Sequence, residues 1–100
     1  MADHHVRGLV QASGAIATGS GFTVEHIVEG TYSVTFNQPF SEAPSVVTTQ
    51  VYPNTSNSTG GDTRDNSVVV YISPQMFRVI TGDSSGKKTD RSFAFIATGN

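Results

Sequence analysis

The chain has 100 residues, with six Lys and Arg against eight Asp and Glu, and a formal net charge of −2. A chain of this length predicts one domain, and the absence of cysteine excludes disulfides, a thiolate nucleophile and a Cys-based zinc site. Only 14% of the residues are charged, so we expect no basic surface for nucleic acid or for an anionic membrane.

Apolar residues alternate with polar ones and do not recur at helical spacing, which predicts an all-β chain. We expect a flexible N-terminal arm over residues 1–7, followed by a single β-sandwich domain over residues 8–100. The strands expected in this domain cover residues 8–18, 21–28, 31–36, 45–52, 67–72, 77–81 and 92–98. Six or seven short antiparallel strands without crossover helices are typical of a β-sandwich or a short jelly roll.

One connection contains an aromatic residue between two prolines. Pro39 and Pro44 are expected to end strands, since proline has no N–H to donate to a strand ladder. Phe40 lies between them, and we expect it to fill the core or an interface where the chain passes from one sheet to the other.

Some of the predicted strands are apolar on both faces. In the last strand Phe93 and Phe95 alternate with Ala94 and Ile96, and residues 67–72 include three successive valines. One face of such a strand fills the core, and the other needs a partner. We expect self-association with closed cyclic symmetry, and we place Val69 and Ile96 at the contact between copies. The alternative is that the N-terminal segment covers these strands.

No feature of the sequence indicates catalysis. We find no nucleophile elbow, phosphate-binding loop or dinucleotide fingerprint, and the carboxylates fall mostly in predicted turns and loops. We therefore expect no enzymatic activity and no cofactor.

Metal binding is a separate possibility at the N-terminus. If Met1 is removed, the chain begins Ala2-Asp3-His4, whose amine, backbone amides and imidazole suit square-planar Cu(II) or Ni(II). We therefore name His4 as a candidate metal ligand, and an arm without this role is the alternative. Asp62 and Asp65 offer oxygen ligands for Ca²⁺, but their spacing matches no calcium loop and an ordinary polar loop explains them.

Two long polar loops, residues 53–66 and 82–91, are the expected place for recognition, because rigid β-sandwiches carry binding residues on such loops. Their side chains supply the donors and acceptors that hydroxyl-rich ligands such as sugars need, and Tyr52 at the edge of the first loop is the nearest aromatic residue. Solvent-exposed loops without a ligand are the alternative. The candidate ligand-binding residues are Asp62, Arg64, Asp65, Asp83, Lys87, Lys88, Asp90 and Arg91.

Four motifs in residues 28–98 together resemble the H-type lectin domain and the related short modules at the tips of phage and phage-like tail fibres. They are Tyr-x-Val-x-Phe at 32–36, Pro39-Phe40-x-x-x-Pro44-x-Val46-Val47, Ser73-Pro74-x-x-Phe77 and the closing strand SFAFIA. The resemblance implies a six-stranded antiparallel sandwich, a homotrimer, and binding of N-acetylgalactosamine-type sugars near subunit boundaries.

The sequence departs from that family at the sugar site. Val68 occupies the place of the arginine that contacts the sugar, and the loop before the last strand has neither the aromatic residue nor the histidine of the family. The family's disulfide is also absent. We therefore expect the fold and the trimer to carry over, but not the galactosamine contacts.

These observations lead to the hypothesis of a trimeric, non-enzymatic binding module for cell-surface carbohydrate, such as a receptor-binding fibre tip with a role in cell adhesion. The alternative is a structural trimerisation or capping module of a fibre or phage-like particle that has no ligand. No segment is apolar enough for membrane insertion or for a secretory signal peptide, so we expect cytoplasmic synthesis with later release or particle association.

Overall fold

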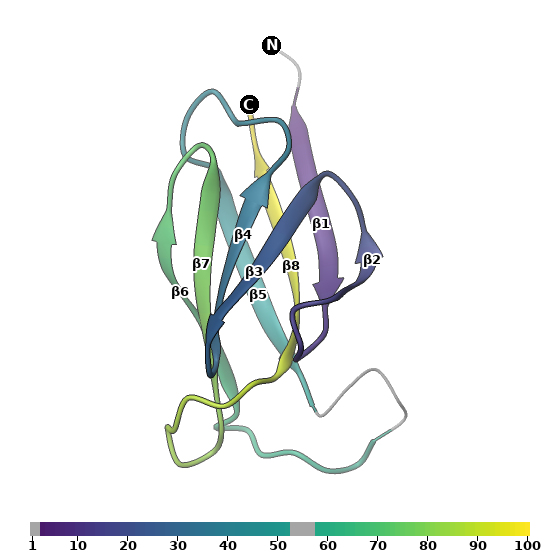
Figure 1. Cartoon of the computed structure of the whole chain (residues 1–100), viewed down its shortest axis with the longest axis vertical. Coiled ribbons are helices and arrows are strands. Elements are labelled where there is room, and N and C mark those ends of the chain that lie inside the picture. Colours follow the sequence, from purple (N-terminus) through teal and green to yellow (C-terminus); the bar gives the residue numbers. More distant parts are fainter. Residues whose placement is uncertain (1–2, 53–57) are drawn as a thin grey trace.

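Two antiparallel β-sheets pack face to face (Figure 1). The computed structural model describes residues 3–52 and 58–100. Within these ranges the strands are β1 (His4–Val10), β2 (Ile16–Gly19), β3 (Phe22–Val28), β4 (Thr31–Phe36), β5 (Ser45–Val51), β6 (Asn66–Ile72), β7 (Met76–Gly82) and β8 (Ser92–Gly99). One sheet has the order β2-β1-β8-β5 and the other β3-β4-β7-β6. The predicted all-β sandwich is confirmed. No helix in the described residues is long and apolar enough to cross a membrane.

The N-terminal part of the prediction was wrong. Residues 8–18 are not one strand, because the chain turns back after Val10 and forms β2, with Gly14 in the left-handed region at φ 94°. His4–Arg7 are not an arm, because β1 pairs with β8 from His4 opposite Gly99 onward. The described residues therefore form eight strands and not six or seven.

Aromatic side chains fill the space between the two sheets. Tyr32, Phe77 and Phe93 are fully buried, and the ring of Phe95 lies 4.9 Å from that of Phe22 in an edge-to-face arrangement. Such rings bury large apolar areas and gain a further contribution of about 0.5–1.5 kcal/mol from this geometry. Gly8 packs directly against the ring of Phe22, and a Cβ at this position would lie 2.3 Å from Phe22 Cζ. Any larger residue at position 8 would therefore displace the ring.

Phe40 is a core residue, as the sequence predicts. It is only 4% exposed, and its ring packs 4.9 Å from that of Phe36 and 4.4 Å from that of His4. Its backbone N–H donates to the Pro74 carbonyl at 2.9 Å. Pro44 is buried and immediately precedes β5, so this connection closes the end of the sandwich at which β1 begins and β8 ends (Figure 1).

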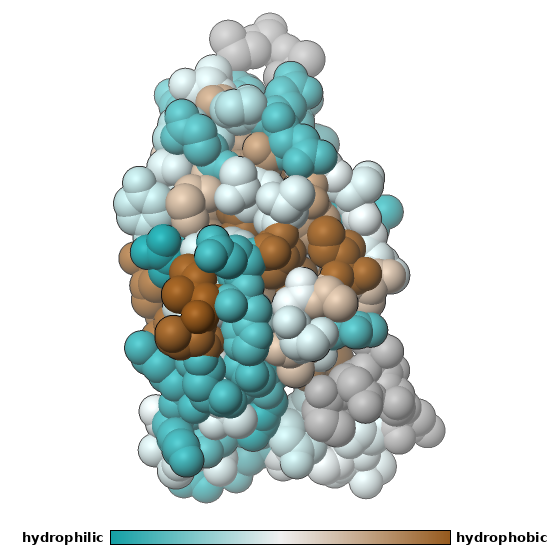
Figure 2. Space-filling view, viewed as in Figure 1, coloured by the Kyte–Doolittle hydropathy of each residue, from teal (hydrophilic) through white to brown (hydrophobic). Residues whose placement is uncertain are grey.

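The outer faces of both sheets carry exposed apolar side chains. On the β5–β8 face, Val47 and Ile96 lie opposite each other in register and are 63% and 50% exposed. Figure 2 shows the other sheet, where apolar side chains gather over β6 and β7 and again near β3. The N-terminal strands do not cover the β5–β8 face, because β1 and β2 continue the same sheet beside β8.

One of the predicted face assignments was wrong. Val69 packs against the core, whereas Val68, Val70 and Tyr71 are exposed. Simple alternation along Val68, Val69 and Val70 places Val69 on the core side, and the register shift between Val69 and Tyr71 leaves Tyr71 exposed next to Val70.

Candidate ligand-binding site

The described parts of both long polar loops lie at one end of the sandwich, opposite the end where β1 begins and β8 ends (Figure 1). The first joins β5 to β6, and the structure describes it from Ser58 onward; the second joins β7 to β8. The sequence predicts both loops as places for recognition, and the fold brings them together from distant parts of the chain.

Arg91 connects the two loops. Its guanidinium lies 3.3 Å from the Asp65 carboxylate and donates to Gln50 Oε1 at 3.0 Å. It also sits over the ring of Tyr52, with 4.8 Å between Cζ and the ring centroid. The side chains of Arg91 and Asp65 are only 15% and 7% exposed, so this is a largely buried ion pair. We call Gln50, Tyr52, Asp65 and Arg91 the Arg91 clamp.

Gln50 extends the clamp to the ends of β6 and β7. Its amide donates to the carbonyls of Asn66 at 2.7 Å and Gly82 at 2.9 Å. Sequence reasoning missed this residue. The sequence signal for it was the alternation in β5, which gives Gln50 a core-facing position where an apolar residue is expected. The structure agrees, because Gln50 lies opposite the buried Phe93.

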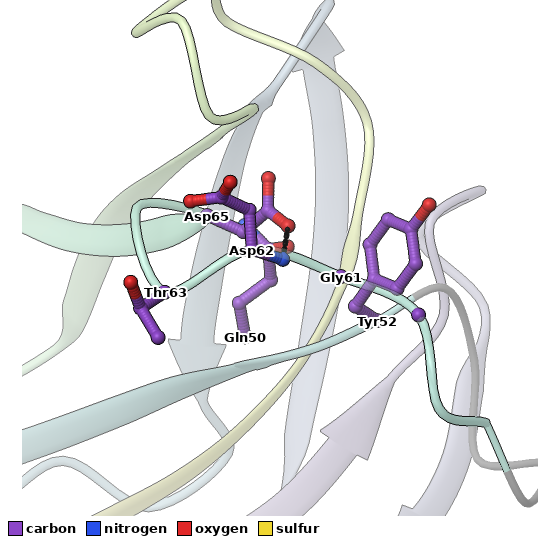
Figure 3. A pocket seen from close by; sticks show the side chains of 7 residues that line it. Gln50, Tyr52, Gly61, Asp62, Thr63 and Asp65 are labelled. Carbon is purple, nitrogen blue, oxygen red and sulfur yellow. Dashed lines mark hydrogen bonds between the residues drawn. The ribbon is translucent and has the colours of Figure 1, made fainter.

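A hollow of about 320 Å³ lies beside Tyr52 (Figure 3). Tyr52 is 40% exposed, and the backbone of Gly60 and Gly61 lies against its ring, since a Cβ on either glycine would come within 3.1 Å of a ring atom. The remaining lining residues are polar: Gln50, Asp62, Thr63 and Asp65. The hollow thus combines an aromatic surface with hydrogen-bonding groups.

The turn from Asp62 to Asp65 forms one wall of this hollow. The Asp65 N–H donates to the Asp62 carbonyl at 3.0 Å, and the Asp62 N–H donates to the Asp65 carboxylate at 2.8 Å. The guanidinium of Arg64 contacts both carboxylate oxygens of Asp62. These guanidinium hydrogen bonds, followed by the one from the Arg64 amide, lower the pKa of Asp62 below its usual value.

A second hollow, of about 250 Å³, lies between this turn and the loop after β7. Arg64 and Lys88 line it together with Asp83, and Val68 and Ile80 add apolar surface. Lys87 is exposed and lines neither hollow.

Asp83 organises its own loop. One of its carboxylate oxygens accepts hydrogen bonds from the Ser85 hydroxyl at 2.7 Å, the Ser85 amide at 2.9 Å and the Lys87 amide at 3.0 Å. The hydrogen bonds from Ser85 and Lys87 lower the pKa of Asp83 to about 2.

Asp90 lies against the β3–β4 hairpin, outside both hollows. It accepts from the Gly30 N–H at 2.6 Å and pairs with His26 Nε2 at 2.8 Å, and His26 in turn stacks on Tyr32. Burial alone would raise the pKa of Asp90, but the hydrogen bonds from Gly30 and His26 outweigh it and the pKa is lowered. Burial, and then the charge of Asp90, raise the pKa of Tyr32 to about 12.

Of the eight residues predicted as ligand contacts, the structure brings Asp62 and Asp65 to the first hollow and Arg64, Asp83 and Lys88 to the second. Arg91 pairs with Asp65 of the first loop, and Asp90 accepts from Gly30 in the β3–β4 hairpin. Lys87 is exposed and lines neither hollow.

The predicted metal ligand His4 is a strand residue. Its Nε2 lies 3.1 Å from the Gln38 carbonyl oxygen. Ala2, which the copper or nickel site would need, is outside the described residues, so that site stays a prediction. Elsewhere in residues 3–52 and 58–100, no group of three or more His, Asp and Glu side chains is placed to hold a metal ion.

Comparisons with protein-family models, with curated proteins and with solved structures found no match to this chain. The family is therefore not identified, and the finding that stands is an all-β sandwich of two four-stranded antiparallel sheets.

Proposed function

We propose that this domain is a non-enzymatic binding module that recognises cell-surface carbohydrate through the hollow beside Tyr52. The observation that carries the proposal is the combination in this hollow of a half-exposed aromatic ring with the polar groups of Gln50, Asp62 and Thr63. Sugars present both a C–H face, which stacks on aromatic rings, and hydroxyls, which pair with carboxylates and amides. The Arg91 clamp fixes these groups before a ligand arrives, which reduces the ordering cost of binding.

The resemblance to H-type lectins and to tail-fibre tips supports a lectin-like module that is displayed as a homotrimer. The exposed pair Val47 and Ile96 on the β5–β8 face supports self-association on separate grounds. In this proposal the sugar contacts differ from those of the family, because they come from Tyr52 and the Asp62 turn.

Binding should depend on Tyr52 and Asp62. We expect Tyr52→Ala and Asp62→Asn each to weaken binding of a soluble glycan, found on a glycan array, by about tenfold or more, which corresponds to about 1.4 kcal/mol. Isothermal titration with the monovalent glycan measures this without a contribution from multivalency.

Two matched variants control for indirect effects. Tyr52→Phe keeps the ring and its contact with Arg91. Glu42→Gln neutralises an exposed carboxylate in the connection between β4 and β5, at the other end of the sandwich. Both variants should bind the glycan as the wild type does. Binding that is indifferent to Tyr52→Ala and Asp62→Asn would place the site elsewhere. A protein that binds nothing on the array would overturn the carbohydrate proposal and favour a structural trimerisation or capping module.

Self-association should depend on Ile96. We expect Ile96→Asp to convert the trimer into a folded monomer of 10.6 kDa, because a carboxylate would be buried without a partner at the contact. Light scattering coupled to size-exclusion chromatography gives the mass, and Thr23→Asp, at an exposed position of β3, is the control. Val69 is unsuitable for this test, since it packs against the core. A monomeric wild type would refute the trimer.

A further inference from the structure

We propose that the hollow between the two loops binds an acidic sugar residue, so that the preferred glycan carries a carboxylate or sulfate group that contacts Arg64 and Lys88. This inference rests on the proposed function and names the class of ligand. Its starting point is position: the two hollows adjoin along one short segment, in which Asp62, Thr63 and Asp65 line the first and Arg64 and Asn66 line the second. The proposal therefore places two linked sugar residues in the two hollows.

The charged groups of the second hollow favour an anion. Lys88 forms no ion pair within the part of the chain that the structure describes. Arg64 uses its Nε and one terminal nitrogen on Asp62, and a guanidinium has five N–H groups, so several donors remain. Two cations that face one cavity are suited to a carboxylate or sulfate, to which they make charge-assisted hydrogen bonds.

Asp83, the one carboxylate that lines this hollow, is already committed to its own loop. Three donors from Ser85 and Lys87 converge on a single oxygen of Asp83, which directs the carboxylate toward the loop backbone. The Asp83 carboxylate is therefore hydrogen-bonded within its own loop, whereas the Lys88 ammonium forms no ion pair within the described residues.

The apolar part of the lining favours an acidic sugar over a free inorganic anion as the ligand. Val68 and Ile80 lie opposite each other in the β6–β7 ladder and both line the hollow. Their apolar surface can contact the C–H groups of a sugar ring or the methyl of an acyl substituent. A small inorganic anion would leave this surface uncovered, so the combination of cations and apolar side chains in one lining favours a charged sugar.

The test is a glycan array on which each neutral oligosaccharide has its sialylated and sulfated counterparts, followed by titration of the best pair. We expect the wild type to bind one acidic form at least about tenfold more tightly than its neutral parent, with a preference that weakens as salt concentration rises. Lys88→Gln should remove most of this preference and leave the affinity for the neutral parent within about twofold. Arg64→Gln should also remove most of the preference, but it also releases Asp62, so Lys88→Gln is the variant that isolates the acidic group. The sialylated and sulfated arms show which acid group is recognised.

Lys87→Gln is the matched control, because it removes the same charge from the neighbouring exposed residue, which lines neither hollow. It should retain the preference for the acidic form. The inference is overturned if the wild type binds both members of the pair equally, or if Lys88→Gln and Lys87→Gln have the same effect. In both of these cases a Tyr52-dependent affinity for neutral glycans still supports the proposed function, whereas loss of all glycan binding overturns both.

Discussion

Replacement of Arg91 by alanine should destabilise the protein by about 3 kcal/mol, toward the lower end of the range for breaking a buried ion pair. The substitution leaves the Asp65 carboxylate in a site that is only 7% exposed, without its cationic partner, and removes the hydrogen bond to Gln50. Urea unfolding measures the loss. We also expect Arg91→Ala to abolish detectable glycan binding, because Tyr52 and the Asp62 turn lose their common support.

A double-mutant cycle with Asp65→Ala separates this pair from general damage to the loop. The Arg91→Ala/Asp65→Ala protein should be at least about 1 kcal/mol more stable than the sum of the two single losses predicts, because it contains no unpaired buried charge. Additive losses, or an Arg91→Ala protein within about 1 kcal/mol of the wild type, would show that the clamp does not hold the loops in solution.

Replacement of Phe40 by alanine should cost about 3–5 kcal/mol of unfolding free energy, as expected for a buried phenylalanine. The cavity would open between the rings of Phe36 and His4, next to the Gly99 backbone, to which Phe40 also packs closely. Phe40→Leu retains most of the side-chain volume and should cost less than about 1.5 kcal/mol.

Both Phe40 variants should retain the glycan affinity of the wild type at temperatures where they are folded, because the connection between β4 and β5 lies at the opposite end of the sandwich from the loops (Figure 1). A Phe40→Ala protein as stable as the wild type would mean that the Pro39–Pro44 connection does not close the core. Loss of affinity in a folded variant would mean that the two ends are coupled.

The sequence predicted the strands from residue 21 onward to within one residue at each end, because alternation and turn residues agree there. It failed for the first two strands for a physical reason. Small residues such as Ala12 and Ala15 give little alternation, and β1 is held by its ladder with β8, a partner from the far end of the chain. Such pairing leaves no local signal in the sequence of β1 itself.

The candidate site was predictable in composition but not in arrangement. The polar loops are evident from the sequence, and the two Asp residues of the first hollow and the cations of the second were among the predicted contacts. Which charges are available to a ligand depends on contacts between distant residues. Lys88, Asp90 and Arg91 are all charged residues of one polar loop in the sequence. In the structure Arg91 pairs with Asp65 and Asp90 accepts from Gly30, whereas Lys88 forms no ion pair within the described ranges.

The position of β8 in its sheet has a consequence for the order of folding. All four strands of the β3-β4-β7-β6 sheet precede β8 in the chain, so this sheet can form before β8 is synthesised. The β2-β1-β8-β5 sheet cannot, because β1 and β5 do not pair with each other and both wait for β8. Until β8 is added, the edges of β1 and β5 that it later covers remain open to pairing with other chains. The chain is therefore most prone to aggregation at this stage of folding. Arg91 immediately precedes β8, so the arrival of the last strand closes the second sheet and locks the loops in the same step.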